Sequence, residues 1–247
     1  MSSSHPNLRV DWCSYEAAKY AVTTWHYSHT MPKSKNAYLG VWEQSEFIGA
    51  LVYSLGSGRA TDGRGFGLQR SFEVVELARV ALRSHVSPVS RILAISVRLL
   101  RREFPKLRLI VSYADPRHGH VGPIYQATNW LYVGPTSPSR AFVDALGREH
   151  HSRVVSHSGV NSHFGQSRHA LRTQDAIKII RLPGKHRYLY PLDPEIATRI
   201  RPLAKPYPRK RAKDSSEPSP VHGEEDGAAP IRTLQTPLPL TTDSRRL

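Results

Sequence analysis

The mostly apolar segment at residues 107–113 (LRLIVSY) constrains the fold more than any other part of this chain. A strand that carries apolar side chains at successive positions has both faces buried, which places it in the middle of a sheet covered on two sides. Residues 74–83 read as the preceding strand, and the helix between them has Ile92 and Val97 on its apolar face. Strand, helix and strand in this order predict a right-handed parallel crossover.

Shorter patterns predict the other elements. Apolar runs on both sides of Gln44, Ser45 and Glu46 are typical of a β-hairpin. The order of elements predicts an α/β (α+β) fold with a mixed central sheet flanked by helices. The other expected helices are one at 15–28 capped by Ser14, one capped by Ser87 with Pro88 in its first turn, and a short one carrying Tyr125. The other expected strands are one at 8–12, a hairpin around Leu146 and Gly147, and a last pair at 176–182 and 186–192. A glycine-rich surface loop is expected at 56–70 and a polar loop at 156–172.

Composition bounds the domain organisation and the compartment. The 247 residues favour one domain at 1–201, followed by a disordered, Pro-rich and charged tail at 202–247. A single cysteine, Cys13, excludes an intrachain disulfide and makes a thiolate zinc site implausible, so a reducing, cytoplasmic setting is expected. The chain has no run of about 18 apolar residues and no apolar signal region, so no membrane partner is expected.

The positive charge belongs mainly to the predicted domain. Of the 35 Lys/Arg and 20 Asp/Glu, the tail holds 8 and 6, which leaves +13 of the net +15 on residues 1–201. A basic folded body favours a polyanionic partner, with nucleic acid as the leading class. A solubilising surface or a site for a phosphorylated cofactor remains the alternative.

Residues 110–134 have the pattern of a reaction centre, because a strand ends at Asp115 and a helix carrying Tyr125 follows. Pro116 directs the Asp115 carboxylate beyond the sheet edge, where it could orient a base, accept a proton or ligate a metal. An ordinary Asp-Pro turn and a structural tyrosine are the competing interpretations. His26, at the predicted end of the first helix, could supply a general base or only complement the helix dipole.

Four segments resemble a known family: WHYSHTMPKSK at 25–35, ELARVAL at 76–82, YADPRHGHVGPIYQATNW at 113–130 and RLPGKHRYLY at 181–190. They are similar to the Mom DNA-modification family of bacteriophages, whose fold belongs to the GNAT superfamily of N-acetyltransferases. The resemblance implies that the exocyclic amine of adenine in double-stranded phage DNA becomes a methylcarbamoyl-type adduct. This adduct would shield the phage genome from restriction enzymes in the cytoplasm of the host cell.

The resemblance also implies roles for individual residues. Tyr125 would protonate the leaving thiolate of an acyl donor such as acetyl-CoA, for which a phenol of pKa ~10 is a credible acid. Acetyltransferases of this superfamily usually hold the donor pyrophosphate on a glycine-rich turn, but residues 84–90 (SHVSPVS) contain no glycine. Binding at a bare helix N-terminus and a donor other than coenzyme A therefore both stay open. The full catalytic set is Tyr125, Asp115, His26 and Tyr27, and the donor-binding set is Arg79, Val80, Leu82, Ser87, Ser90 and Arg91.

An enzyme that acts on adenine within a duplex has to extrude the base and stack it on aromatic side chains, here Trp25, Tyr27 or Trp130. Charged residues in two loops and in the last strands are candidate contacts to the DNA, although each could also be merely solvated. These candidates are Lys33, Lys35, Arg59, Arg64, Arg70, Lys185, His186, Arg187 and Tyr188.

Several alternatives remain open. A divalent metal such as iron, held by His26 and Asp115, could activate the donor, but the spacing does not single out a metal site. An ordinary N-acetyltransferase for a small amine or a protein, and a basic DNA-binding protein without catalysis, are the two other functions compatible with the pattern. The oligomeric state and the preferred DNA sequence are not predicted.

Overall fold

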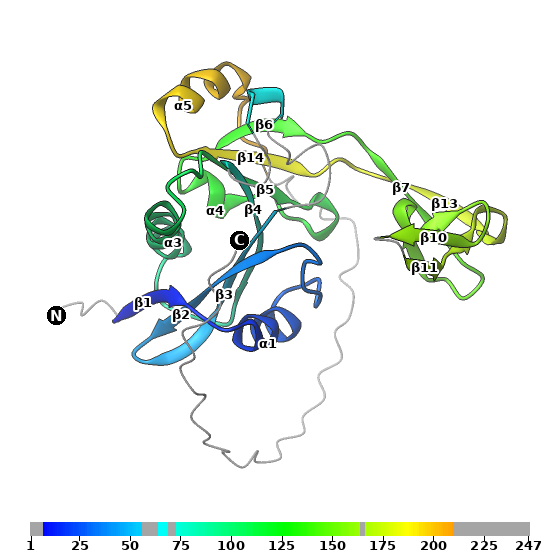
Figure 1. Cartoon of the computed structure of the whole chain (residues 1–247), viewed down its shortest axis with the longest axis horizontal. Helices are drawn as coiled ribbons and strands as arrows, with labels where there is room; N and C mark the ends of the chain where they lie inside the picture. Colours follow the sequence, from blue (N-terminus) through cyan, green and yellow to red (C-terminus); the bar gives the residue numbers. More distant parts are fainter. Residues whose placement is uncertain (1–6, 56–63, 69–72, 164–165, 210–247) are drawn as a thin grey trace, which may run out of the picture.

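A seven-stranded mixed sheet forms the centre of the computed structural model, which describes residues 7–55, 64–68, 73–163 and 166–209 (Figure 1). Among its neighbouring strands only β4 and β5 are parallel, and α3 (Val89–Glu103) connects them as the sequence predicted. In spatial order the strands are β1 (Leu8–Trp12), β2 (Asn36–Glu43), β3 (Glu46–Ser54), β4 (Val74–Leu82), β5 (Leu109–Ala114), β14 (His186–Pro191) and β6 (Leu131–Pro135).

Helices cover both faces of this sheet, as expected. On β3, Ala50 and Val52 pack with α1 (Tyr15–Trp25), whereas Leu51 belongs to the core cluster that includes α3. Because alternate residues of a strand point to opposite faces, α1 and α3 lie on opposite sides of the sheet. The mixed α/β fold class with flanking helices is therefore confirmed, as is the β2–β3 hairpin with its turn at Gln44 and Ser45.

The structure adds a C-terminal helix that the sequence analysis missed. Asp193 caps α5 (Pro194–Ile200), because its carboxylate accepts a hydrogen bond from the backbone N–H of Ile196 at 3.0 Å. A turn at Arg201–Leu203 follows, and the chain then runs along β6, where the Lys205 N–H donates to the carbonyl of Tyr132 and the Tyr207 hydroxyl to that of Trp130. The body therefore extends past the expected boundary at Arg201.

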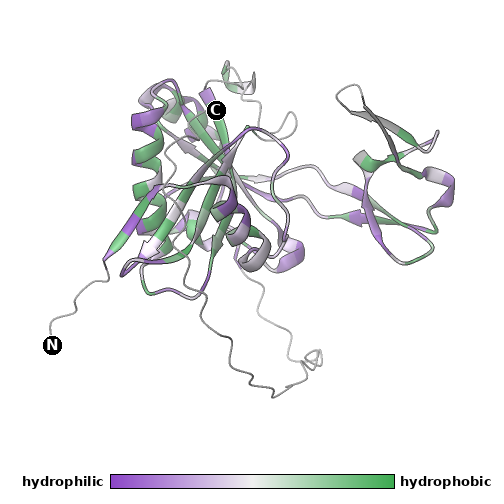
Figure 2. Ribbon diagram, turned by 60° about the horizontal axis from the view of Figure 1, so that its bottom comes forward, coloured by the Kyte–Doolittle hydropathy of each residue, from purple (hydrophilic) through white to green (hydrophobic). Residues whose placement is uncertain are grey.

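A small β-structure, here called the arm (residues 139–182), projects from the body between β6 and β14 (Figures 1 and 2). The predicted polar loop at 156–172 instead contains four short strands, and β13 pairs with β7 and not with β14, so the expected last hairpin is wrong. The polar composition of 156–172 gave no sign of these strands, which pair as β10 with β11 and β12 with β9. The elements of the arm are β7 (Ser139–Val143), β8 (Glu149–His151), a turn at Ser152–Val154, β9 (Val155–Ser156), β10 (Val160–His163), β11 (Gln166–His169), β12 (Leu171–Arg172), a turn at Thr173–Asp175 and β13 (Lys178–Leu182).

Two predicted helix ends also differ from the structure. The first helix ends at Trp25 and not at residue 28, because His26 has extended backbone angles, so His26 lies just outside the helix. Ser87 does not cap α3, whose N-cap residue is Pro88 without a side-chain hydrogen bond. Within the described residues, no helix has the length and apolar character needed to cross a lipid bilayer.

Candidate active site

A cavity of about 400 Å³ lies where the two parallel strands separate. The β4–β5 pairing runs from Val74 and Leu109 to Leu77 and Ser112, and then stops although both strands continue. At the same place the register between β3 and β4 shifts by one residue, which leaves Ala78 as a bulge in β4. A bulge bends its strand and disrupts the ladder, so the opening is built into the sheet.

The cavity brings together the four predicted catalytic residues, which come from three distant parts of the chain. His26 and Tyr27 come from the segment after α1, Asp115 follows β5, and Tyr125 comes from α4 (Pro123–Gln126). Val80 and Leu82 of β4 add apolar walls. The predicted convergence of His26, Asp115 and Tyr125 is therefore seen in the structure.

Tyr125 is buried on the inner side of this cavity and is linked to the protein by a short hydrogen-bond chain. Ser112 Oγ lies 2.7 Å from the Tyr125 phenol and 2.7 Å from the carbonyl oxygen of Leu77. Because a carbonyl only accepts, the phenol can donate its own proton to Ser112 whenever Ser112 donates to Leu77. Burial raises the pKa of Tyr125 to about 12, against the opposing effect of the Ser112 hydrogen bond, so the phenol keeps its proton at neutral pH.

Gly122 allows this packing of Tyr125. It precedes α4 with a φ of 75°, and a Cβ placed there would lie 2.6 Å from Tyr188 and 2.9 Å from Tyr125. Any other residue would both strain the backbone and push the two rings apart.

His26 is neutral and its tautomer is set by its surroundings. Burial lowers the pKa of His26 to about 4, and the nearby charges of Arg79 and of His120, His29 and His118 act in the same direction. Its Nδ1 accepts a hydrogen bond from the backbone N–H of Ser28 at 3.1 Å, so the neutral ring carries its proton on Nε2. His26 is thus a hydrogen-bond donor in this arrangement, which differs from the general base predicted for it.

Tyr27 forms the centre of a stack of rings that the sequence analysis did not foresee. The centre of its ring lies 4.3 Å from that of His26, 4.4 Å from that of His118 and 5.3 Å from that of His120. His118 and His120 belong to the turn after β5, whose sequence PRHGH was noted but given no role. Tyr27 remains 44% exposed, so part of its surface is accessible to a ligand.

Asp115 is engaged by the protein itself. Its carboxylate lies 3.1 Å from the ammonium of Lys185 and accepts the backbone N–H of Arg117 at 3.0 Å. Burial opposes ionisation, but these hydrogen bonds keep the pKa of Asp115 below its usual range. Lys185, predicted as a DNA contact, is thus a partner of a predicted catalytic residue.

The residues predicted to hold the donor lie in four separate places. Val80 and Leu82 line the cavity, while Ser90 and Arg91 line a separate groove of about 370 Å³ beside Trp130. The Arg79 guanidinium donates to the backbone carbonyls of Thr30 and Ala78, so it is occupied within the protein.

Ser87 is buried next to a carboxylate of the same chain. Glu43 accepts hydrogen bonds from the backbone N–H groups of Val86 and Ser87, just before α3. Desolvation raises the pKa of Glu43, but these hydrogen bonds outweigh it and lower the pKa overall, which keeps the carboxylate ionised. A negative charge therefore lies where a donor pyrophosphate was expected, and these residues do not fit that group.

Two groups of predicted DNA contacts have different positions. Lys33 and Lys35 are exposed in the segment before β2. Arg59 and Arg70 lie outside the described residues, and only the backbone of Arg64 is described, in the turn Arg64–Phe66.

The predicted DNA contacts of the last strand are mostly directed into the protein. Tyr188 is fully buried and donates its hydroxyl proton to the carbonyl of Val121, so its prediction as a DNA contact is wrong. His186 lies 3.0 Å from the Tyr132 hydroxyl, and burial lowers the pKa of His186. Arg187 is half-buried opposite Tyr113.

A metal site does not emerge from the expected pair of ligands. His26 Nδ1 and the Asp115 carboxylate both have partners within the protein, and the described residues contain no group of three or more His, Cys, Asp or Glu side chains able to hold a metal ion. No step of the chemistry is therefore assigned to a metal.

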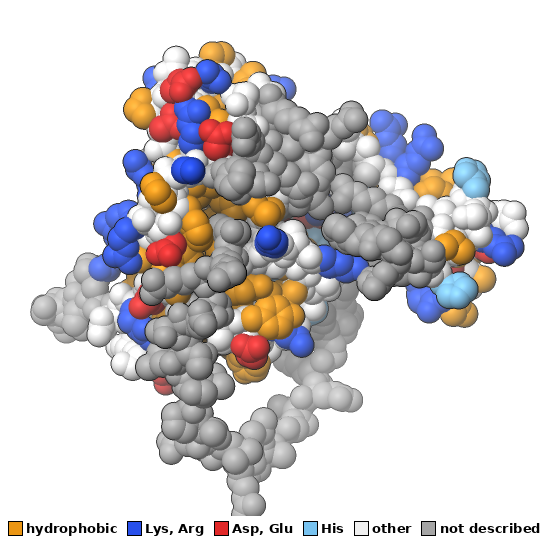
Figure 3. All heavy atoms as spheres, viewed as in Figure 1, with side chains coloured by type: hydrophobic (Ala, Val, Ile, Leu, Met, Phe, Trp, Pro, Cys, Tyr) orange, Lys and Arg blue, Asp and Glu red, His pale blue; other side chains and the backbone are white. Residues whose placement is uncertain are grey.

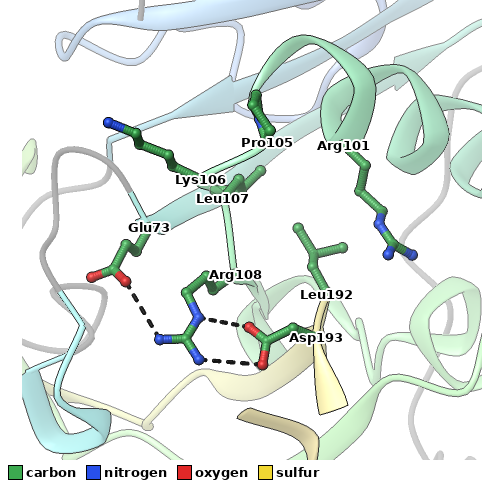
Figure 4. Close-up of a pocket in the computed structure, with 8 residues that line it drawn as sticks. All are labelled: Glu73, Arg101, Pro105, Lys106, Leu107, Arg108, Leu192 and Asp193. Carbon is green, nitrogen blue, oxygen red and sulfur yellow. Dashed lines mark hydrogen bonds and ion pairs between the residues drawn. The ribbon is translucent and has the colours of Figure 1, made fainter. Parts of the chain in front are cut away.

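A second hollow lies at the other end of the parallel strands (Figure 4). It measures about 770 Å³, and in it Arg108 contacts Asp193 at 2.7 Å and Glu73 at 3.5 Å. These ion pairs tie α5 to the start of β5. This hollow is larger than the cavity beside Tyr125, but Arg108, Glu73 and Asp193 in it are engaged with one another.

The comparison with protein families decides which family this architecture belongs to. The model described as the Mom protein family matches residues 7–209. The chain belongs to the Mom protein family. Methylcarbamoylase mom of Escherichia phage Mu is a relative that is 26% identical over 215 residues, a match that covers 82% of this chain and 84% of that protein. The resemblance found in the four sequence segments is therefore confirmed, and the Mom family match reaches past Arg201, as the contacts of the body do.

Two solved structures are similar to this Mom-family chain at low scores. FeeM, an N-acyl amino acid synthase from uncultured soil microbes, has a TM-score of 0.42 and 13% identity, covering 78% of this chain and 95% of its own. Malonyl-CoA decarboxylase from Agrobacterium vitis has a TM-score of 0.32 and 10% identity, covering 44% of this chain and 33% of its own. At such scores neither structure adds to the description of the fold.

Proposed function

We propose that the protein is a bacteriophage enzyme that transfers an acyl-type group, of the methylcarbamoyl kind, to N6 of adenine in double-stranded DNA. The observation that carries this proposal is the cavity between β4 and β5, where a protonated Tyr125 faces an opening bordered by stacked aromatic and imidazole rings. Membership of the Mom family and the +13 charge on residues 1–201 support DNA as the substrate.

The rim of the cavity is suited to a base that has left the duplex. Ring contacts with His26 and His118 fix the orientation of Tyr27 while leaving 44% of the residue exposed. A flipped base needs a flat aromatic surface to replace the stacking that it loses. Tyr27 is our candidate for this surface, in place of Trp130, which is fully buried.

The transfer needs two proton movements. As adenine N6 bonds to the acyl carbon, one N6 proton has to leave, and the group that departs from the acyl carbon has to gain one. Tyr125 can donate the second proton, since its phenol stays protonated below its pKa of about 12. We assign acceptance of the first to His120, an exposed imidazole that lines the cavity.

In this proposal His26 and Asp115 transfer no proton; they orient the reacting groups and the residues around them. The neutral His26 ring can donate from Nε2 to the oxygen of the acyl group as charge develops there. Asp115 holds Lys185 beside the cavity and, through the Arg117 N–H, shapes the turn that carries His118 and His120.

The lining of the cavity indicates the chemical class of the acyl donor. Val80 and Leu82 give the cavity an apolar wall against which an acyl group can lie. Acetyl-CoA is the donor that the resemblance implies, but Glu43 already accepts the backbone N–H groups that its pyrophosphate would need. We therefore propose an activated acyl or carbamoyl donor whose charged end, if it has one, lies away from Val86 and Ser87.

A modified N6 would protect the DNA for a simple geometric reason. Adenine presents its N6 amine as a hydrogen-bond donor in the major groove, where sequence-reading proteins contact it. An acyl group on N6 obstructs that contact, so restriction enzymes of the host would no longer cut. The host cytoplasm is the compartment in which this protection would act.

The test is nucleoside mass spectrometry of DNA from cells that produce the protein, with an empty vector as control. A heavier deoxyadenosine, together with resistance of the same DNA to restriction enzymes that recognise adenine, is expected. Unmodified DNA with turnover of a free amine would indicate an ordinary N-acetyltransferase. Unmodified DNA with salt-sensitive duplex binding would indicate a binding protein without catalysis.

A further inference from the structure

The arm carries a charge excess that the proposed chemistry does not use. Residues 139–182 contain seven Lys/Arg and three Asp/Glu. Two of the acids are paired: Asp144 contacts Arg148 at 2.8 Å, and Glu149 contacts Arg117 of the body at 2.9 Å. On the face drawn in Figure 3, Lys and Arg side chains surround hydrophobic ones on the arm, at the right.

Arg140 and Arg181 form an unusual pair within this arm. They lie directly opposite each other in the antiparallel β7–β13 ladder, so their side chains project from the same face of that sheet. Both are exposed, and among the described side chains no carboxylate pairs with either guanidinium. Like charges in direct opposition destabilise a ladder, and an anion from outside the protein would remove this repulsion.

The face that bears the arginines is the open face of the arm's sheet. On the other face, Ala141 and Val143 are buried, whereas beside the arginines Ile179 is 55% exposed and lies opposite Phe142. Two guanidinium groups next to a short apolar strip match the alternation of phosphate and deoxyribose along a DNA strand.

The pair lies at the root of the arm, close to the cavity. Arg181 is four residues from Lys185, a span of at most about 14 Å, and Lys185 contacts Asp115 at the cavity. Since a strand of duplex DNA advances ~3.4 Å per nucleotide, this span corresponds to about four nucleotides. The Arg117–Glu149 ion pair joins the arm to the turn that carries His118.

We propose that the open face of the β7–β8–β13 sheet binds the phosphodiester backbone of duplex DNA a few nucleotides from the adenine in the cavity, with Arg140 and Arg181 as phosphate ligands. This inference rests on the proposed function, because DNA is the partner in both. The arm then holds the duplex beside the cavity while a base leaves it. The arm contacts the phosphodiester backbone of the DNA and not the base edges, so it does not select a DNA sequence.

The test compares two double variants that remove the same charge. Arg140→Gln/Arg181→Gln alters the arm, and Arg98→Gln/Arg102→Gln alters two exposed arginines one turn apart on α3, which lies on the opposite side of the body from the arm (Figure 1). Affinity for a fluorescein-labelled duplex of mixed sequence is measured by anisotropy over a range of KCl concentrations. Melting temperature and light scattering report folding and oligomeric state.

The arm variant is expected to bind the duplex at least tenfold more weakly at ~0.1 M salt, with a salt slope reduced by ~1.8, or ~0.9 for each phosphate that is no longer neutralised. Its melting temperature should stay level or rise, because the like-charge pair is gone. Equal losses of duplex affinity in both variants would mean that only net charge matters, and would overturn the proposal. Unchanged affinity of the arm variant, or a loss explained by a change in its oligomeric state, would overturn it as well. If wild-type protein modifies adenine but the arm variant binds normally, only the arm proposal fails; if wild-type protein binds no duplex, the proposed function fails as well.

Discussion

Two buried tyrosines in this protein have nearly the same surroundings but different access to the outside. The Tyr53 phenol lies 2.7 Å from Ser96 Oγ, which donates to the carbonyl of Leu93, and Tyr125 forms the same kind of chain with Ser112 and the carbonyl of Leu77. Burial raises the pKa of both phenols. Tyr53 is sealed between β3 and α3, whereas Tyr125 lines the cavity.

The difference teaches that the hydrogen-bond chain by itself does not make a site. At Tyr53 the strand β3 is paired on both sides, with β2 and β4, and Tyr53 is fully buried, so nothing reaches its phenol. At Tyr125 the ladder stops after Leu77 and Ser112, and the separated strands leave space for a reactant. The same chain stabilises the core in one place and can serve as a proton donor in the other.

Substitutions of the two serines should distinguish the Tyr125 site from the Tyr53 site most clearly, after substitutions of the tyrosines themselves. In Ser112→Ala the phenol loses the partner that positions it, and we expect adduct formation per folded protein to fall about tenfold, the value of one hydrogen bond of ~1.4 kcal/mol. Ser96→Ala should leave activity unchanged. Both should lose ~1–3 kcal/mol of stability in urea titrations, because a buried group is left unsatisfied. An equal loss of activity in the two variants would remove the distinction.

The cavity also contains His26, whose titration affects stability between about pH 4 and pH 6.5. The hydrogen-bond chain of Tyr53 includes no such group. The folded-state pKa of His26 is about 4 and its ordinary value is 6.5, so between these values the unfolded chain binds a proton that the folded protein does not. The contribution of His26 to stability is complete above pH 6.5 and is lost as the pH falls towards 4. Urea titrations at pH 7 and pH 5 should show a smaller loss in His26→Gln than in the wild type. The same loss in both would assign the pH dependence to other groups.

The smallest effect on activity is expected far from both tyrosines, in the hollow drawn in Figure 4. Asp193→Ala removes the N-cap of α5 and a partner of Arg108, which should cost ~1 kcal/mol and lower the melting temperature by a few degrees. Adduct formation per folded protein should not change. A specific loss of activity would mean that this end of the sheet takes part in the chemistry.

The sequence predicted those parts of the fold that repeat a simple period. The apolar run of β5, the amphipathic α3 and the β2–β3 hairpin were recognisable because each forms its own pattern. The short strands at 155–172 were not, because their polar side chains show no alternation. Asp193 and Pro194 form a recognisable N-terminal signal for α5, but the proline-rich segment that follows indicates a disordered tail.

The site was predictable where its residues are close in sequence. Asp115 and Tyr125 stand ten residues apart around one turn, so their convergence could be expected. The pairing of Asp115 with Lys185 depends on the register of β5 against β14, which no local pattern reveals. For the same reason the three cationic or titratable residues before Tyr188 suggest a surface position, whereas Tyr188 is fully buried.

The central claim, that the cavity and not the hydrogen-bond chain determines the function, is tested most directly by one series of nucleoside analyses. DNA is taken from cells that produce the wild type, Tyr125→Phe or Tyr53→Phe at equal levels of folded protein, and its deoxyadenosine is weighed by mass spectrometry. The heavier nucleoside should be present with the wild type and Tyr53→Phe, and reduced by a factor of ~100 or more with Tyr125→Phe, the range that a general acid contributes. Full retention of the adduct in Tyr125→Phe, or equal loss in both variants, would contradict the account.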